Sequence, residues 1–377
     1  MKFIKLSLIA ALAVTTAMAG DAKISGDAKV FYSTSDANKA DLFDKGANSM
    51  GDAAISLDYS RDIADGVSLN AGVTGVSTLG LESTLVGATW IDHALKDRAW
   101  IDVANVTAKL GNTTAVIGRQ KLDTPLAFTE TWNIAENTFD AFTFVNSDLT
   151  DTTLVASAVT RANGGEFTNI QGGMTDVGEG IYAFGAVTKL IPNTTAQLWY
   201  YDFAHNDNKK LWVQADANVA SGITAGVQYA KAMVDNGDDS SVVAAKLGYD
   251  AKPMSLYAAY SKADDKGTLG FANYGGFGAS KLYTEAWWNL GFVSKPGAQA
   301  VAVGASTDVS GLGLTAQYTT VTNDSNLASD EMDEVTLTAT KKVGPVDATL
   351  ALINTSSDDD TIDGNTVQAY ITVPFSL

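Results

Sequence analysis

The last twelve residues, 366–377, alternate between apolar and polar side chains at every step. Val367 and Ile371 lie on one face of the expected strand, and Gln368 and Thr372 lie on the other. A strand with one apolar and one polar face is typical of a closed barrel that has lipid outside and water within. A soluble β-sandwich gives the same period, with its apolar face turned toward a core, so the alternation alone leaves both folds open.

The same alternation recurs along the chain and predicts eighteen strands, an even number. Most are about ten residues long, the length that a tilted strand needs to cross the hydrocarbon layer. The predicted strands are residues 23–32, 52–62, 67–77, 99–110, 113–121, 139–146, 152–161, 181–190, 194–203, 209–219, 222–233, 241–251, 254–263, 298–308, 312–322, 335–343, 346–355 and 366–377.

The connections between these strands alternate between short and long. Tight turns such as Gly111-Asn112 are followed by long, polar links such as residues 122–138 and 264–297. Outer-membrane barrels place short turns on the periplasmic side and long loops outside, whereas a sandwich has no reason to sort its loops by length. We therefore expect an all-β, transmembrane, antiparallel up-and-down barrel of eighteen strands, with sixteen as the alternative.

The N-terminus has the features of an export signal. Two lysines precede an apolar run over residues 6–18, which ends in an Ala-Met-Ala pattern at 17–19. The run is shorter than the ~20 apolar residues of a spanning helix, which argues against a membrane anchor. We expect a signal peptide over residues 1–19 and a single barrel domain over residues 20–377.

Composition excludes several classes of function. The formal net charge is −18, and removal of the signal takes away two of the 25 basic residues and none of the 43 acidic ones, which gives −20. Nucleic acid is therefore not expected as a partner. There is no cysteine, and His93 and His205 are the two histidines, so thiolate or histidine metal sites and serine–histidine catalysis have almost no material. We expect no enzyme activity, no metal site and no cofactor, although acidic loops at 235–239 and 358–363 suit loosely bound Ca²⁺.

One segment resembles a known family. Gly118-Arg119-Gln120, Thr124-Pro125-Leu126 and Asn137-Thr138-Phe139 match the G-R-Q, T-P-L and N-T-F elements of OprD-like outer-membrane porins, a group that includes the OprD-type and major-outer-membrane-protein channels. The resemblance implies an eighteen-stranded barrel in the outer membrane of a Gram-negative bacterium, commonly a homotrimer or loosely associated. It also implies a third loop that folds into the lumen and narrows a channel for small solutes and ions.

The resemblance also suggests which residues shape the channel. It places three acidic residues in the constricting third loop, namely Asp123, Glu130 and Glu136. A carboxylate-bearing loop opposite basic wall residues creates a transverse field in a narrow, wet neck. The candidate basic residues of the wall are Arg119, Arg161 and Lys246.

The alternation supports an inward Lys246, which shares its face with Asp250. It gives less support to an inward Arg119, because Arg119 shares its face with the apolar Ile117. The chain also departs from the basic-amino-acid channels of the family, because its inward rows contain few arginines and lysines, and its terminal aromatic, Phe375, is followed by two further residues. With the negative net charge, this favours mild cation selectivity.

Two other readings remain open at this point. The chain is alternatively an exported β-rich adhesin or structural surface protein without a pore, or a barrel hydrolase, for which two loop histidines give little support. The expected partners of a porin are outer-membrane lipid and lipopolysaccharide, together with small hydrophilic solutes and ions.

Overall fold

The computed structural model describes residues 22–44, 48–81, 84–87, 97–164, 174–323 and 331–377. The signal peptide predicted over residues 1–19 lies outside this range. Within it there are eighteen strands and two 3-10 turns, η1 (Ala37–Lys39) and η3 (Phe292–Ser294). The strands are β1 (Lys23–Ser35), β2 (Ser49–Ala64), β3 (Val67–Ser77), β4 (Arg98–Leu110), β5 (Thr113–Gln120), β6 (Phe139–Asn146), β7 (Thr152–Ala162), β8 (Thr175–Thr188), β9 (Thr194–Phe203), β10 (Asn208–Ala220), β11 (Ile223–Met233), β12 (Ser240–Ala251), β13 (Met254–Ala263), β14 (Ala298–Val309), β15 (Leu312–Asn323), β16 (Met332–Val343), β17 (Val346–Ser357) and β18 (Gly364–Ser376).

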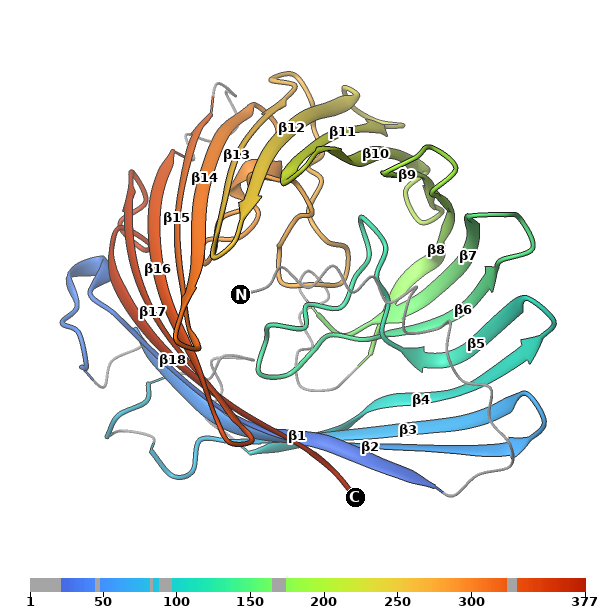
Figure 1. Ribbon diagram of the computed structural model, residues 1–377, viewed down its shortest axis with the longest axis horizontal. Helices are drawn as coiled ribbons and strands as arrows, with labels where there is room; N and C mark the ends of the chain where they lie inside the picture. The colour runs from blue at the N-terminus through green and yellow to red at the C-terminus, as the bar shows by residue number, and fades with distance from the viewer. Residues whose placement is uncertain (1–21, 45–47, 82–83, 88–96, 165–173, 324–330) are drawn as a thin grey trace.

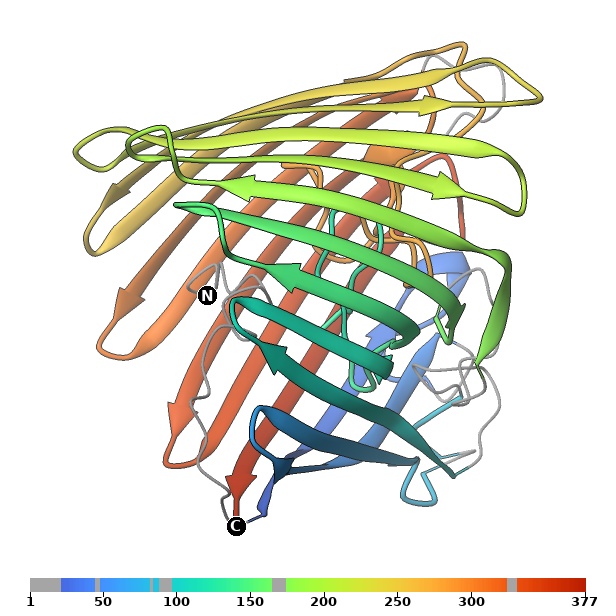
Figure 2. The ribbon, with the colours of Figure 1, turned by 90° about the vertical axis from the view of Figure 1, so that its right-hand side faces the viewer.

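The strands form one closed antiparallel ring, which is visible end-on in Figure 1. Each strand pairs with its neighbours in sequence, and β1 pairs with β18 from Ser25↔Ser376 to Ser35↔Thr366, which closes the ring. Figure 2 shows the strands inclined side by side along the wall. Closure leaves no strand edge unpaired, as a barrel in lipid requires. The prediction of an eighteen-stranded up-and-down barrel is confirmed, and the sixteen-stranded alternative is wrong.

The two faces of the wall differ in polarity. On β12 the side chains of Val243 and Leu247 point outward and are 50% and 59% exposed, whereas Ala244 between them is buried. On β18, Ile371 is exposed and Gln368 is fully buried. The apolar side chains therefore cover the outside of the ring, as expected for a surface in contact with lipid.

Three strands begin at least three residues earlier than the alternation predicts. β2 begins at Ser49, β8 at Thr175 and β16 at Met332, whereas the pattern placed their starts at residues 52, 181 and 335. In β8 the reason is local, because Gly178 and Gly180 have positive φ values of 79° and 104° and interrupt the regular alternation of side chains.

Two long connections lie inside the ring in Figure 1: residues 121–138 between β5 and β6, called loop 3 below, and residues 264–297 between β13 and β14, called loop 7. Both contribute to the main buried apolar cluster, through Leu126 of loop 3 and through Phe271 and Leu282 of loop 7. These side chains pack against inward residues of the wall, such as Trp212 of β10. The core of this protein therefore lies within the barrel, between its loops and its wall. None of the described helices is long and apolar enough to cross a membrane.

Candidate pore constriction

Glu136 of loop 3 forms ion pairs with two lysines. Its Oε2 lies 2.6 Å from Nζ of Lys121, the first residue after β5, and its Oε1 lies 3.6 Å from Nζ of Lys29 on β1. Lys29 also lies 3.8 Å from Oδ2 of Asp27 on the same strand. These contacts attach the C-terminal part of loop 3 to β1 and to the end of β5. All of these side chains are partly exposed, so the charges face the lumen.

The wall beside this contact carries further carboxylates that the sequence did not single out. Asp58 of β2 and Asp102 of β4 flank Gly72 of β3, where a Cβ would stand 3.0 Å from Asp58 Oδ1 and 2.5 Å from Asp102 Oδ1. Thr74 Oγ1 donates to Asp102 Oδ2 at 2.5 Å. The missing side chain of Gly72 lets the two carboxylates approach each other across three strands. Asp27 and Glu136 lie within electrostatic reach of Asp58, so this side of the lumen is rich in acid.

Glu130 joins the two inward loops and does not face the lumen. It is fully buried, and its Oε1 accepts hydrogen bonds from Asn273 Nδ2 at 2.9 Å and from the Phe277 N–H at 2.8 Å, both in loop 7. Asn133 Nδ2 donates to its other oxygen at 3.1 Å. Burial raises the pKa of Glu130. Glu130 was predicted to face the constriction, but in the structure it links loop 3 to loop 7 and is inaccessible to a solute.

Asp123 also contacts loop 7. It forms a close ion pair with Lys281, whose Nζ lies 4.7 Å from the ring centroid of Phe128. Both charged side chains are partly exposed. The sequence predicts loop 3 alone as an inward element, and the structure adds loop 7 as its direct partner.

Loop 7 is fixed by two buried carboxylates. Glu334 of β16 accepts the backbone N–H groups of Trp287, Trp288 and Asn289 at 2.8–3.1 Å. Within the loop, Glu285 accepts the N–H groups of Ser280, Ala286 and Gly291 at 2.6–3.2 Å. Burial raises the pKa of Glu285 to about 7. No sequence pattern marked these two carboxylates. Glu334 lies about 45 residues from the N–H groups that it accepts.

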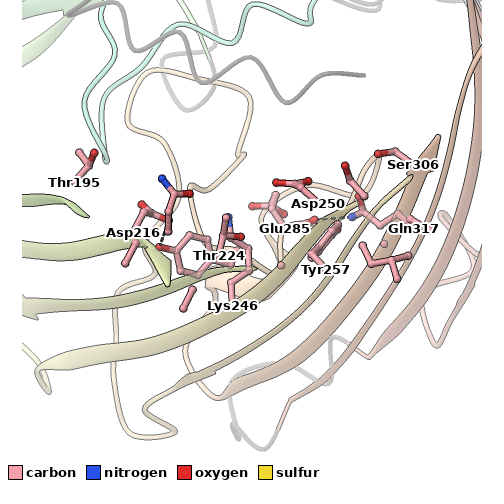
Figure 3. Close-up of a pocket in the computed structure, with 18 of the residues that line it drawn as sticks. Thr195, Asp216, Thr224, Lys246, Asp250, Tyr257, Glu285, Ser306 and Gln317 are labelled. Atoms are coloured by element: carbon pink, nitrogen blue, oxygen red, sulfur yellow. Dashed lines mark hydrogen bonds between the residues drawn. The ribbon is translucent and has the colours of Figure 1, made fainter. Parts of the chain in front are cut away.

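Below loop 7 the lumen widens on one side into a cavity of about 950 Å³, which we call the lateral bay (Figure 3). It is lined by residues of β9–β15, by Lys189 and Asn193 of the β8–β9 turn, and by loop 7, including Tyr283 and Glu285. Lys246, predicted to face inward, lines the bay with its Nζ 4.2 Å from the ring centroid of Tyr283. Tyr283 donates a hydrogen bond to Asp216 Oδ1 at 2.9 Å.

Arg119 and Arg161 were predicted to line the lumen, but the structure places them elsewhere. Arg119 Nε and Arg161 Nη2 lie 2.9 and 2.6 Å from the two oxygens of Asp140. Asp140 lies two residues from Phe142 and so on the same face of β6, and Phe142 is 49% exposed on the outside. Arg119 pairs with Asp140 across the strands, just as Ile117 pairs with Phe142. The three charges therefore lie on the outer surface at the long-loop end of the wall. The position of Arg119 on the same face as Ile117 correctly indicated that it points outward, and the expectation that it faces loop 3 across the lumen was wrong.

The histidines form no catalytic arrangement among the described residues. His205 Nε2 lies 3.2 Å from the hydroxyl of Tyr274, and His93 falls outside the described residues. In the part of the chain that the structure describes, no three His, Cys, Asp or Glu side chains converge as metal ligands do.

No protein-family model matches this chain, and no curated protein matches its sequence. Solved structures match it closely in three dimensions. They include the outer membrane protein OpdK of Pseudomonas aeruginosa, with a TM-score of 0.79 at 16% identity over 95% of this chain and 99% of that chain. OccK8 (OprE) of the same organism gives a TM-score of 0.77 at 16% identity, over 95% and 98%. OccAB4 of Acinetobacter baumannii gives 0.78 at 14% identity, over 96% and 100%.

The chain has the fold of these proteins. The coverage is nearly complete on both sides, so the likeness extends to the whole barrel and not to a single hairpin. The resemblance drawn from the motifs around loop 3 is thus confirmed at the level of the fold.

Proposed function

We propose that this chain is an OprD-like porin of a Gram-negative outer membrane, which lets small hydrophilic solutes and ions diffuse through its lumen. The observation that carries the proposal is the closed ring of eighteen strands with an apolar outer face and a polar inner face. Barrels of this size enclose more space than their side chains fill and leave an aqueous channel. The fold shared with OpdK, an outer membrane protein by description, supports the location.

The outer surface supports a position within a bilayer. Tyrosines point outward near the long-loop end of several strands and are 37–42% exposed, namely Tyr182, Tyr229, Tyr260 and Tyr318. At two of them a charged residue follows at the next outward position, since Lys231 follows Tyr229 and Lys262 follows Tyr260. Aromatic side chains at the level of the headgroups, with charges just beyond them, are typical of a membrane interface.

The charges of the lumen support mild cation selectivity. On the β1–β5 side, Asp27, Asp58, Asp102 and Glu136 outnumber the lysines that contact them, Lys29 and Lys121. Fixed negative charge on the wall of a narrow aqueous pore raises the local concentration of cations. Screening limits this effect to about 10 Å at moderate salt, so selectivity depends on these nearby charges and not on the net charge of the chain.

The first prediction concerns ion selectivity. In planar bilayers under a salt gradient, we expect a reversal potential that shows preference for potassium over chloride. The double variant Asp58→Asn/Asp102→Asn should reduce this preference, because it removes two carboxylates from the lumen wall. Asp359→Asn, in an exposed loop, is the matched control and should leave it unchanged. A clear chloride preference of the unmodified protein would refute the selectivity, and a lack of any conductance would refute the porin.

Other expectations accompany the proposal. A homotrimer is expected from the family resemblance, and outer-membrane lipid and lipopolysaccharide are expected around the barrel. We expect no catalysis and no tightly bound cofactor, with Ca²⁺ at most loosely held by the acidic loops. The alternative of an adhesin without a pore is not favoured by a closed, lipid-faced ring. Single-channel recording separates the two readings, because an adhesin carries no current.

A further inference from the structure

Three hydroxyl groups form a row across the floor of the lateral bay. Ser255 of β13 is the register partner of Ser306 of β14, and Ser306 is the register partner of Thr315 of β15. All three residues line the bay. Cross-strand neighbours of this kind have Cβ atoms about 5 Å apart, so the row presents three evenly spaced hydroxyls to one cavity.

These hydroxyls differ from other inward Ser and Thr pairs of the barrel. Elsewhere such pairs hydrogen-bond to each other, as in Ser56–Thr74 at 2.9 Å and Thr340–Thr349 at 2.9 Å. The row in the bay makes no such bonds: Thr315 Oγ1 is buried without a hydrogen-bond partner within the described structure. A buried polar group without a partner costs free energy unless water or a ligand satisfies it. Ser255 and Ser306 are partly exposed and can meet an occupant of the bay directly, whereas the covered Thr315 hydroxyl must first turn about its Cα–Cβ bond.

The adjacent row supplies an apolar surface. Tyr257 is the register partner of Gly248 on one side and of Gly304 on the other. A Cβ at Gly304 would overlap the ring of Tyr257, so the glycine lets the ring lie against the wall of the bay. Figure 3 shows Tyr257 between the strands, close to Ser306 and Gln317. An aromatic face beside a row of hydroxyls suits a solute that has C–H groups on one side and O–H groups on another.

The charges that line the bay are nearly balanced. Lys189 and Lys246 are matched by Asp216 and Asp250, and Glu285, whose pKa burial raises to about 7, adds at most one further negative charge. A bay with at most one excess charge gives little net attraction to a simple anion or cation. Hydroxyl groups both donate and accept, and so do those of a sugar.

We propose that the lateral bay is a binding subsite for a neutral, polyhydroxylated solute of the sugar class. The hydroxyls of Ser255, Ser306 and Thr315 bond to those of the solute, and Tyr257 packs against its C–H face. The proposal rests on the proposed porin function and adds a class of solute to it. The acid-rich side of the lumen and the bay then have different roles, the first acting on ions and the second on neutral solutes.

The test uses the full barrel in planar bilayers, with D-glucose and glycine as probes. Glucose is neutral and carries several hydroxyls, whereas glycine is a zwitterion that carries none. We expect glucose to reduce the ion current at lower concentration than glycine does. In the variant Ser306→Ala/Thr315→Val the glucose concentration for half-block should rise about tenfold, since each lost hydrogen bond contributes about 1 kcal/mol or less.

The control is Thr372→Val, an inward threonine of β18 outside the bay, which should leave the block by glucose unchanged. The porin function is tested by the current itself, so its failure is distinguishable from failure of the subsite. With normal conductance, equal block by both probes, or block that the bay variant does not alter, would overturn the proposal and leave water as the occupant of the bay. Stronger block by glycine would instead assign the bay to zwitterions.

Discussion

At the scale of single residues, buried carboxylates hold the interior of this barrel together. Glu130 and Glu334 are buried and Glu285 is partly buried, and each accepts several hydrogen bonds from loop 3 or loop 7. A buried carboxylate is costly unless it is well hydrogen-bonded, and backbone N–H groups are donors that cannot be lost by side-chain rotation. The position of both loops therefore depends on a few acidic residues whose oxygens are occupied by hydrogen bonds within the protein.

Glu285 makes loop 7 sensitive to pH. Because its pKa in the folded protein is about 7, above its ordinary value of 4.5, the folded state binds the proton more tightly than the unfolded state. The free energy of unfolding thus falls as pH rises from about 4.5 to about 7, by on the order of 1–3 kcal/mol. We expect residues 280–291 to be better protected from amide hydrogen exchange at pH 5 than at pH 8.

The variant Glu285→Gln resembles the protonated form and should remove most of this pH dependence. Asp265→Asn is the control, because Asp265 is exposed in the same connection. Protection factors that are equal at both pH values in the unmodified protein would contradict the assignment.

At the scale of a single strand, adjacent residues face different solvents. On β17, Leu350 points outward with 47% exposure, and its neighbour Thr349 points inward and bonds to Thr340. A lysine on the lipid face of a barrel costs about 2–4 kcal/mol near the bilayer midplane, whereas a lysine in a wet lumen keeps its hydration.

We therefore expect Leu350→Lys to lower the free energy of unfolding in lipid vesicles by about 2 kcal/mol or more, and Thr349→Lys to lower it much less. Urea titration of the refolded variants provides the measurement. Equal losses for the two lysines would mean that both faces of β17 meet the same environment, which a lipid-embedded barrel excludes.

At the scale of the whole molecule, two loops divide the interior. Loop 3 and loop 7 are joined by Glu130, by the ion pair of Asp123 with Lys281, and by a hydrogen bond from the N–H of Tyr274 to the carbonyl of Leu126 at 2.7 Å. Together they occupy space that eighteen strands alone leave open. If the barrel conducts as proposed, we expect the size of its passage to depend on this contact between segments about 150 residues apart.

Shortening loop 7 should widen the passage. Replacement of residues 272–291 by a short Gly-Ser linker removes the partner of loop 3, and we expect a higher single-channel conductance with larger current fluctuations. The control replaces residues 235–238, an exposed link between β11 and β12, and should leave the conductance unchanged. Heat-modifiable migration on a gel shows that each variant still forms a barrel. Unchanged conductance of the loop 7 variant would mean that the narrowest point lies elsewhere.

The sequence by itself determined the barrel. The alternation of side chains is a local property with a period of two, and it specified all eighteen strands, the outward apolar face and the inward position of Lys246. It misled where the backbone departs from regular geometry, as at Gly178 and Gly180 in β8. It also gave the parity that places Arg119 outside, although the family resemblance suggested the lumen.

Only the tertiary structure decided what lies inside the ring. Loop 7 has no periodic pattern, so nothing local marked it as the partner of loop 3, and the burial of Glu130 depends on Asn273 and Phe277 far along the chain. The approach of Asp58 and Asp102 over Gly72, and the hydroxyl row of Ser255, Ser306 and Thr315, likewise follow from strand register. The periodicity of a strand tells which way a side chain points, whereas closure of the ring decides which side chains it meets.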